Sequence, residues 1–130
     1  RLASNVVISS KESLDEEFIK LVNQTIEACS DNAALSVHDI AQRISLTPDQ
    51  LSRKLKALTG ISTNQYIRSY RLNMAAALLR TKKYMVTEVL YQVGFNNPSY
   101  FTKCFKAEFG VSPSEYLTSI DEMGDETEKC

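Results

Sequence analysis

The feature that most constrains how this chain folds is an internal repeat. Residues 47–67 read TPDQLSRKLKALTGISTNQYI, and residues 97–117 read NPSYFTKCFKAEFGVSPSEYL. The matched positions are Pro48 with Pro98, Leu51 with Phe101, Arg53 with Lys103, Leu55 with Phe105, Lys56 with Lys106, Gly60 with Gly110, Ser62 with Ser112 and Tyr66 with Tyr116. The similarity extends upstream, where Val37–Ile44 aligns with Val86–Val93. The sequence therefore predicts two copies of one small structural unit.

Both copies carry the signals that begin and end helices. A serine or threonine followed three residues later by an acidic or amide side chain forms a capping box, which begins a helix. Such boxes are present at Ser13–Glu16, Ser36–Asp39, Thr47–Gln50, Ser62–Gln65 and Ser112–Glu115. Two more helices are predicted at Val86–Val93 and after Asn97-Pro98, and Gly60 and Gly110 stand where helices end in a left-handed residue. The predicted fold is all-α, with about seven helices.

Each repeated unit consists of a short helix, a tight turn of three or four residues and a second, more basic helix. Two helices joined in this way form a helix-turn-helix, whose second helix enters the major groove of DNA. Charge is distributed to match, because residues 37–117 hold 11 Lys and Arg against 5 Asp and Glu while the flanks are acidic. A basic middle suits a polyanionic partner, although charge also fluctuates along any solvated chain.

Apolar and cationic side chains fall on opposite sides of the second helix in both copies, at about 100° per residue. The predicted core side contains Leu51, Leu55 and Leu58 in one copy and Phe101, Phe105 and Phe109 in the other. The residues predicted to bind DNA are Asp49, Gln50, Ser52, Arg53, Lys56, Asn97, Ser99, Tyr100, Thr102, Lys103 and Lys106. Long cations reach guanine edges or phosphates, and hydroxyls and amides at a helix start bind phosphate oxygens. A single basic helix is usually solvent-facing, so the prediction depends on the two matched copies.

Several of these residues allow more than one interpretation. Tyr100, at the edge of its helix, is suited equally to contacting DNA and to packing. Asp49 is unusual on a DNA-facing surface: it can favour the helix N-terminus, accept a hydrogen bond from cytosine, or repel wrong sequences. Cys104 lies between the core and polar sides, where a redox role is an alternative to a structural one, and His38 is expected on the surface.

Other function classes find less support in the sequence. The three cysteines are far apart and His38 is the single histidine, so neither a disulfide framework nor a metal site is expected. No nucleophile–base pair or phosphate-binding glycine loop is present, and we expect neither enzymatic activity nor a cofactor. The alternative from another class is an α-helical protein-interaction adaptor that does not bind DNA, which would expose an apolar patch in place of the basic stripe.

The chain resembles the DNA-binding domain of the AraC/XylS family of bacterial transcription regulators. The residues that carry the resemblance are Val93-Gly94-Phe95, Pro98-Ser-Tyr100-Phe101, Phe105-Lys106, Gly110, Ser112–Tyr116, Leu51, Arg53, Lys56, Gly60, Tyr66, Arg71-Leu72, Ala75 and Leu78-Leu79. Leu90 replaces a small alanine of the family pattern, and Tyr84-Met85 replaces a polar cap. The segments 14–18 and 53–60 further resemble the C-terminal output domain of hybrid two-component regulators.

The resemblance implies two helix-turn-helix subdomains joined by a linker helix. The expected parts are a disordered or linker lead-in at 1–12, an AraC-type DNA-binding domain at 13–117 and an acidic flexible tail at 121–130. Within the domain we expect a first subdomain at 13–60, a linker helix at 62–80 and a second subdomain extending over 84–120. A helix of that length spans roughly 27 Å, and major grooves on one face of DNA recur at about 34 Å.

The resemblance also implies partners and a cellular place. The expected partners are double-stranded promoter DNA, RNA polymerase and the receiver and kinase modules of the same protein, with no small-molecule ligand. The expected location is the cytoplasm, with a full-length protein that can be tethered to the inner membrane.

Overall fold

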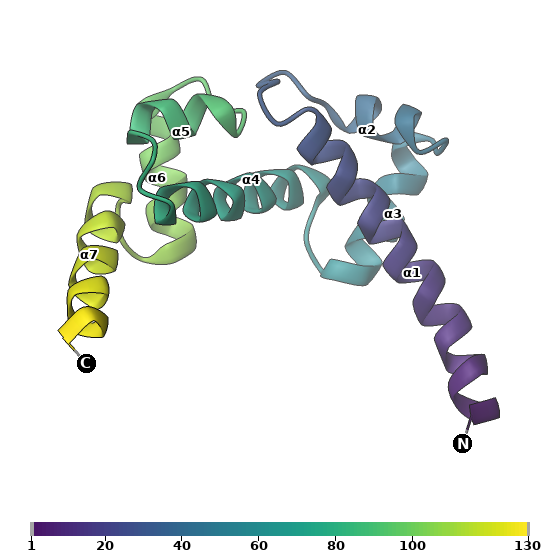
Figure 1. Cartoon of the computed structure of the whole chain (residues 1–130). Coiled ribbons are helices and arrows are strands. Elements are labelled where there is room, and N and C mark those ends of the chain that lie inside the picture. The colour runs from purple at the N-terminus through teal and green to yellow at the C-terminus, as the bar shows by residue number, and fades with distance from the viewer. Residues whose placement is uncertain (1, 130) are drawn as a thin grey trace. The chain divides into compact units, whose positions relative to one another are not determined.

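The structure is a computed structural model that describes the backbone of residues 2–129 and the side chains of residues 13–121. The described residues form helices joined by turns and contain no strand. The helices are α1 (Leu2–Ala28), α2 (Val37–Arg43), α3 (Pro48–Thr59), α4 (Thr63–Arg80), α5 (Val86–Gln92), α6 (Pro98–Phe109) and α7 (Pro113–Lys129) (Figure 1). The all-α prediction and the number of helices are confirmed.

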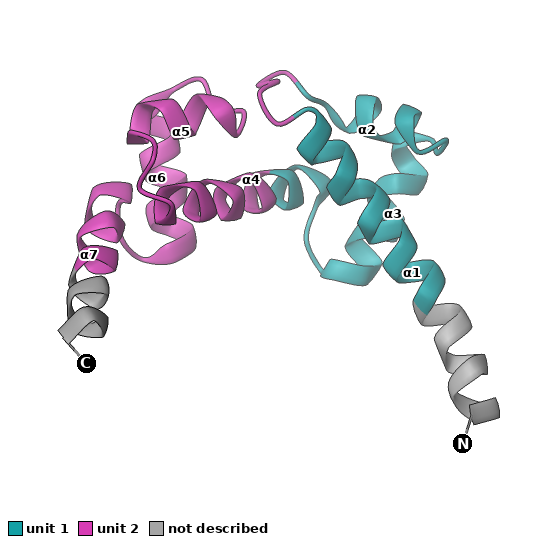
Figure 2. Ribbon diagram, viewed as in Figure 1, with its two compact units in different colours: residues 1–29, 35–67 teal, residues 30–34, 68–130 magenta. Residues whose placement is uncertain are grey.

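The chain divides into two compact units, each containing one helix-turn-helix (Figure 2). Unit 1 comprises residues 1–29 and 35–67, and unit 2 comprises residues 30–34 and 68–130. The long helix α4 begins in unit 1 and continues into unit 2. Residues 30–34 belong to unit 2, although their neighbours on both sides in the sequence belong to unit 1.

Unit 1 packs α1 against the helix-turn-helix formed by α2 and α3. Its buried apolar side chains come from all of these helices and from the start of α4: Phe18, Val22, Ile26, Ile40, Ala41, Leu51, Leu55 and Ile67. The Nζ atom of Lys54 on α3 lies 4.8 Å from the centre of the Phe18 ring on α1. This contact fixes an alkyl stem and a charge over an aromatic face at the edge of the core.

Unit 2 repeats this arrangement, with the C-terminal part of α4 in place of α1. Its core contains Leu72, Ala75, Ala76, Leu79, Val89, Leu90, Val93, Phe95, Phe101 and Phe105. The aromatic rings form a continuous series, with centroids 5.1 Å apart for Phe95 and Phe101 and 5.8 Å apart for Phe101 and Phe105. Phe109 and Tyr116 extend the series towards α7, where the Tyr116 hydroxyl accepts a hydrogen bond from Arg80 at 2.7 Å.

The predicted capping signals form the expected bonds at four helix starts. The serine or threonine oxygen accepts from the backbone N–H three residues later, and the side chain of that later residue accepts in return, at Ser36/Asp39, Thr47/Gln50, Ser62/Gln65 and Ser112/Glu115. These hydrogen bonds from Ser36 and Ser112 lower the pKa values of the Asp39 and Glu115 carboxyls. Only half of the box forms at Met85, whose N–H donates to Glu88 while its own side chain cannot accept.

The turns inside the two helix-turn-helix motifs have the same backbone hydrogen bonds. In unit 1, Leu46 N–H donates to the Ala41 carbonyl at 2.9 Å and Ser45 N–H to Gln42. In unit 2, Phe95 N–H donates to the Leu90 carbonyl, also at 2.9 Å. This pattern is a Schellman motif, and it places Ser45 at φ 62° and its counterpart Gly94 at φ 93°.

Two predictions about side chains and boundaries are wrong. The helix predicted to begin at Ser13 is α1, which begins at Leu2. Residues 1–12 contain no glycine or proline that would stop a helix. The helix therefore continues on the N-terminal side of the capping box at Ser13–Glu16. Leu58 was predicted in the core but is 40% exposed, while Leu51 and Leu55 are fully buried. It lies at the C-terminal end of α3, on the rim of an open cavity against α1.

The predictions for the two ends of the chain remain untested. The side chains of residues 1–12 and of the acidic tail from residue 122 onward lie outside the described set. Among the residues that are described, no helix combines the length and the apolar character that a membrane span requires.

Candidate nucleic-acid interface

The exposed side of α3 carries the two cations predicted for unit 1. Arg53 and Lys56 are both exposed, and Asp49 lies one turn before Arg53 on the same side. The Arg53 guanidinium forms an ion pair with the Asp49 carboxylate at 2.7 Å, with about three quarters of each side chain in solvent. Such an exposed pair contributes little to stability. The pair occupies the Arg53 guanidinium, so any further acceptor of Arg53 would compete with Asp49.

The exposed side of α6 carries the corresponding residues of unit 2. Ser99, Thr102, Lys103 and Lys106 are all exposed. Within the described residues, neither lysine has a carboxylate oxygen within 4.0 Å of its amine. Ser99 stands where unit 1 has Asp49, so the cations of α6 have no carboxylate neighbour at the start of their helix. The two helices present two cations at matching positions in different electrostatic settings.

Two of the predicted DNA-binding residues take part in capping. The Gln50 side chain accepts a hydrogen bond from Thr47 N–H at 3.0 Å, and the Asn97 side chain accepts from Tyr100 N–H at 3.0 Å. Both side chains are exposed. Their amide N–H groups point away from these bonds and are the donors that remain for a phosphate oxygen.

Ser52 and Thr102 occupy equivalent positions but have different surroundings. The Ser52 side chain is half-buried, and its hydroxyl accepts a hydrogen bond from the buried Thr63 hydroxyl at 3.3 Å. In unit 2 the residue equivalent to Thr63 is Pro113, which has no hydroxyl, and Thr102 is exposed. Ser52 therefore lies on α3 between the core side and the cationic side. Helical periodicity had predicted it on the cationic side.

Tyr100 is both packed and accessible. Its ring centroid lies 6.1 Å from that of Phe95, and 49% of the side chain is exposed. Tyr100 also lines a small cavity of about 370 Å³ in unit 2, together with Lys103, Cys104 and Arg68. Arg68 was not among the predicted site residues. The sequence feature that could have identified Arg68 is a basic residue on α4, the helix that lines this cavity together with α6.

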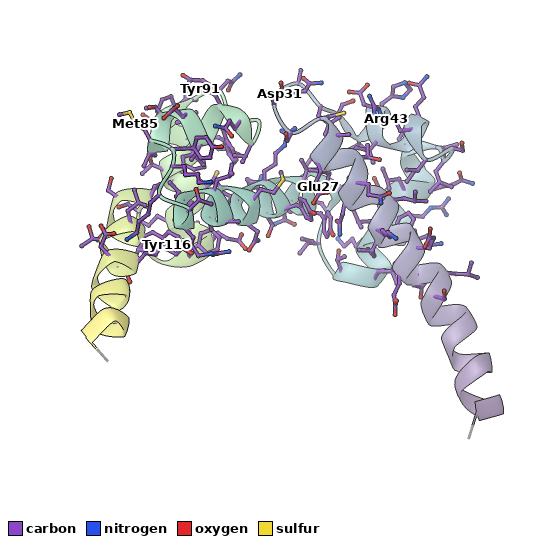
Figure 3. The ribbon with its side chains drawn as sticks, viewed as in Figure 1. Glu27, Asp31, Arg43, Met85, Tyr91 and Tyr116 are labelled. Atoms are coloured by element: carbon purple, nitrogen blue, oxygen red, sulfur yellow. The ribbon has the colours of Figure 1, made fainter. Side chains whose placement is uncertain are left out.

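The described part of the chain offers little for other chemistry. No group of three or more His, Cys, Asp and Glu side chains is close enough to hold a metal ion there. Exposed apolar side chains lie at and on α5: Met85, its N-cap, is 69% exposed and Tyr91 is 52% exposed. Both residues are labelled in Figure 3. They accompany the cationic sides of α3 and α6 rather than replacing them.

The helix-turn-helix geometry agrees with the match to a known family. A family model described as a helix-turn-helix domain matches residues 40–119, which include most of both motifs. The chain belongs to the AraC-type helix-turn-helix family. This family is a family of transcription regulators, and the domain type is its DNA-binding domain.

Individual relatives of this AraC-type domain show the same relationship. The arabinose operon regulatory protein of Escherichia coli K12 is 32% identical over 128 residues, which are 93% of this chain and 44% of that protein. Histidine kinase P4 of Formosa agariphila is 35% identical over 120 residues, which are 92% of this chain and 8% of the kinase. The chain thus spans less than half the length of either relative.

A solved structure gives the same fold with DNA bound. The DNA-binding domain of AdpA, a global transcriptional factor, was solved in complex with a target DNA. It is 26% identical in sequence to this AraC-type domain, with a TM-score of 0.69. The match covers 78% of this chain and 90% of that one.

Proposed function

We propose that the chain is the sequence-specific DNA-binding output domain of a signal-transduction regulator, and that α3 and α6 read two adjacent major-groove segments of a promoter. The observation that carries this proposal is the pair of helix-turn-helix motifs whose second helices both expose two cations on one side. One such unit makes few contacts, whereas two units on one chain bind as a bivalent reader. The complex of AdpA with its target DNA supports the same use of the fold.

The exposed side chains have distinct roles in this proposal. Arg53 and Lys103, near the middle of α3 and α6, contact base edges, for which guanine O6 and N7 are the preferred acceptors. Lys56 and Lys106, one turn further, contact phosphates. The base preference is adjusted by Asp49, Ser99 and Thr102. The DNA backbone is held at the two helix starts by Gln50, Ser52, Asn97 and Tyr100.

The proposed partners outside the described structure follow from the relatives. Histidine kinase P4 carries a related segment within a much longer protein, which supports upstream kinase and receiver modules for this chain. RNA polymerase is the proposed recipient of the output, because the arabinose regulator is named as an operon regulatory protein. A phosphorelay would then control how this domain binds DNA.

The proposal is tested by measuring affinity for a duplex that the chain selects from a random pool, at increasing salt. Each phosphate contact releases condensed counterions, so the logarithm of the affinity should fall steeply and linearly with the logarithm of the salt concentration. Arg53→Ala and Lys103→Ala should each weaken binding to the selected duplex by about 1–3 kcal/mol. Lys20→Ala, an exposed cation on α1 outside the helix-turn-helix motifs, is the control.

An absence of retardation at low salt, or an affinity that does not change with salt, would contradict the proposal. Binding to protein partners without DNA would then favour the adaptor, with Met85 at the start of α5 and Tyr91 on α5 as its contact surface. An equal loss on selected and on random DNA would instead show that Arg53 or Lys103 contacts a phosphate rather than a base.

A further inference from the structure

An arginine is buried beside the turn of the second helix-turn-helix. Arg71, on the part of α4 that belongs to unit 2, is 5% exposed. Its Nη1 donates a hydrogen bond to the Gly94 carbonyl at 3.3 Å, and its Nη2 donates to the Asn32 carbonyl at 2.7 Å. The planar guanidinium has several donors in a fixed geometry, which suits it to hold two carbonyl groups at once.

Gly94 is fitted closely against this arginine. A Cβ atom at Gly94 would lie 2.4 Å from Arg71 Cζ and 2.6 Å from the Ser30 carbonyl oxygen, closer than real Cβ atoms approach other heavy atoms. By contrast, a Cβ at Gly110 of the same unit would meet nothing within 4 Å, although its φ of 81° is also left-handed. The guanidinium, the α5–α6 turn and residues 30–34 therefore pack as one arrangement.

The loop at 30–34 is folded so that the Asn32 carbonyl group faces Arg71. The Asn32 side chain accepts a hydrogen bond from Ala34 N–H at 2.9 Å, which is a local turn closed by the loop itself. Residue 29 before the loop and residue 35 after it belong to unit 1. Wherever the two units lie, the chain passes from unit 1 into unit 2 at this loop, returns to unit 1, and passes again along α4.

We propose that Arg71 is a positioning residue that fastens the loop at 30–34 to the turn of the second helix-turn-helix, and so ties unit 1 to unit 2 at a second place besides α4. The proposal rests on the proposed function, in which α3 and α6 bind neighbouring grooves. A single connection leaves one helix of the pair free to search when the other is bound. A second connection restricts that search and raises the effective concentration of the second reader.

The experiment compares Gly94→Ala with Gly110→Ala in the full chain. Both substitutions place alanine at a left-handed position of unit 2, but only Gly94→Ala displaces the Arg71 guanidinium. Affinity is measured for a duplex selected by the unaltered chain from a random pool, and for two duplexes in which one or the other half of that site is scrambled. Gly94→Ala should bind the complete site about tenfold more weakly. It should bind each half-site within about twofold of the unaltered chain, and Gly110→Ala should keep both affinities.

A pair of insertions tests the tether without touching the arginine. Flexible Gly-Ser segments inserted both between Cys29 and Ser30 and between Ala34 and Leu35 leave Arg71 and its two carbonyl partners in place but slacken both connections. This variant should show the same loss on the complete site. The matched control carries insertions of the same length in the exposed loop between α4 and α5, which joins parts of unit 2 only.

The outcomes separate this proposal from the proposed function. If Gly94→Ala and the double insertion bind the complete site as well as the unaltered chain does, Arg71 does not tie the units. If Gly94→Ala loses as much on the half-site of unit 2 as on the complete site, Arg71 only maintains the fold of that unit. If the unaltered chain selects no sequence from the pool, the proposed function itself fails.

Discussion

The turn of unit 1 and the turn of unit 2 have the same backbone hydrogen bonds and opposite environments. In unit 1, Ser45 is exposed and its two neighbours are half-buried, while in unit 2 Val93, Gly94 and Phe95 are all buried. The local signals that set the turn are therefore sufficient in both copies. The difference comes from a distant part of the sequence, because Arg71 and residues 30–34 cover only the second turn.

The two units also differ in how closely their paired helices pack. The backbones of α2 and α3 lie close together at more positions than those of α5 and α6 do. Ala41 is buried in α2 where α5 has the buried Leu90, and α6 has phenylalanine where α3 has leucine. Larger side chains hold helices apart, so the second copy fills its interior with aromatic volume instead of close backbone contact.

The largest expected effect comes from the two cores. Phe105→Ala should lower the free energy of unfolding by about 3–5 kcal/mol and Leu55→Ala by about 2–5 kcal/mol, because each leaves a cavity among fully buried side chains. Denaturant titration of each variant measures the loss. Leu58→Ala is the control and should change stability by no more than about 1 kcal/mol. If Leu58→Ala lowered the free energy of unfolding as much as Leu55→Ala does, Leu58 would be part of the core after all.

The next effect concerns the carboxylate that α3, but not α6, carries in its first turn. Asp49→Ser gives α3 the residue found at the start of α6, releases Arg53 from its ion pair and removes a negative charge from the cationic side of the helix. Affinity for random-sequence DNA should rise by about 1 kcal/mol, and the base preference next to Arg53 should weaken. Titration of both selected and random duplexes checks this. Ser99→Asp is the reciprocal variant, and an unchanged affinity in both would show that Asp49 lies away from the DNA.

A smaller effect concerns the turn of unit 1. Ser45 adopts a left-handed conformation that costs a non-glycine residue about 1–2 kcal/mol. Glycine removes this cost, but it loses part of the benefit because it has more conformational freedom in the unfolded chain. Ser45→Gly should therefore stabilise the protein by about 0.5–1 kcal/mol, measured by thermal unfolding. Its matched partner is Gly60→Ala, which places a side chain at φ 81° without a clash and should be destabilising. Destabilisation by Ser45→Gly would indicate that the serine side chain stabilises the turn.

The smallest effect is the pH dependence of the helix caps, one in each unit. Hydrogen bonds from Ser36 and Ser112 lower the pKa values of the Asp39 and Glu115 carboxyls below their ordinary values. A carboxyl whose pKa is lower in the folded protein stabilises it above its unfolded pKa, and this contribution disappears as the pH falls through the folded value. Asp39→Asn and Glu115→Gln should each flatten the loss of thermal stability on acidification. An unchanged pH profile would contradict the capping assignment.

The sequence predicted most of the fold because its signals are local. Capping boxes, prolines at helix starts and glycines at helix ends placed five of the helices, and the repeat placed α5 and predicted two similar motifs. The start of α1 was missed because a capping box is informative only where something upstream interrupts the helix. The exposure of Leu58 and the half-burial of Ser52 depend on α1 and Thr63, which helical periodicity within α3 does not include.

The candidate site was predictable to the same extent. Ten of the eleven predicted residues are exposed on or at the start of α3 and α6, because the cationic side of an amphipathic helix follows from spacing alone. The ion pair of Arg53 with Asp49 follows from their separation of four residues. Its meaning for binding depends on a comparison with α6, where Ser99 and Lys103 occupy the matching positions and form no such pair. The role of Arg71 depends on three segments that are distant in sequence, and no local pattern contains that information.

In the proposed function, α3 and α6 are two non-equivalent readers of one DNA site. Selection from a random pool with the unaltered chain, with Arg53→Ala and with Lys103→Ala tests it most directly. The account predicts one site of about two helical turns, in which each variant loses base preference in a different half, with the halves centred about 10 base pairs apart. Loss of preference at the same positions in both variants, or a selected site of a single half, would contradict it.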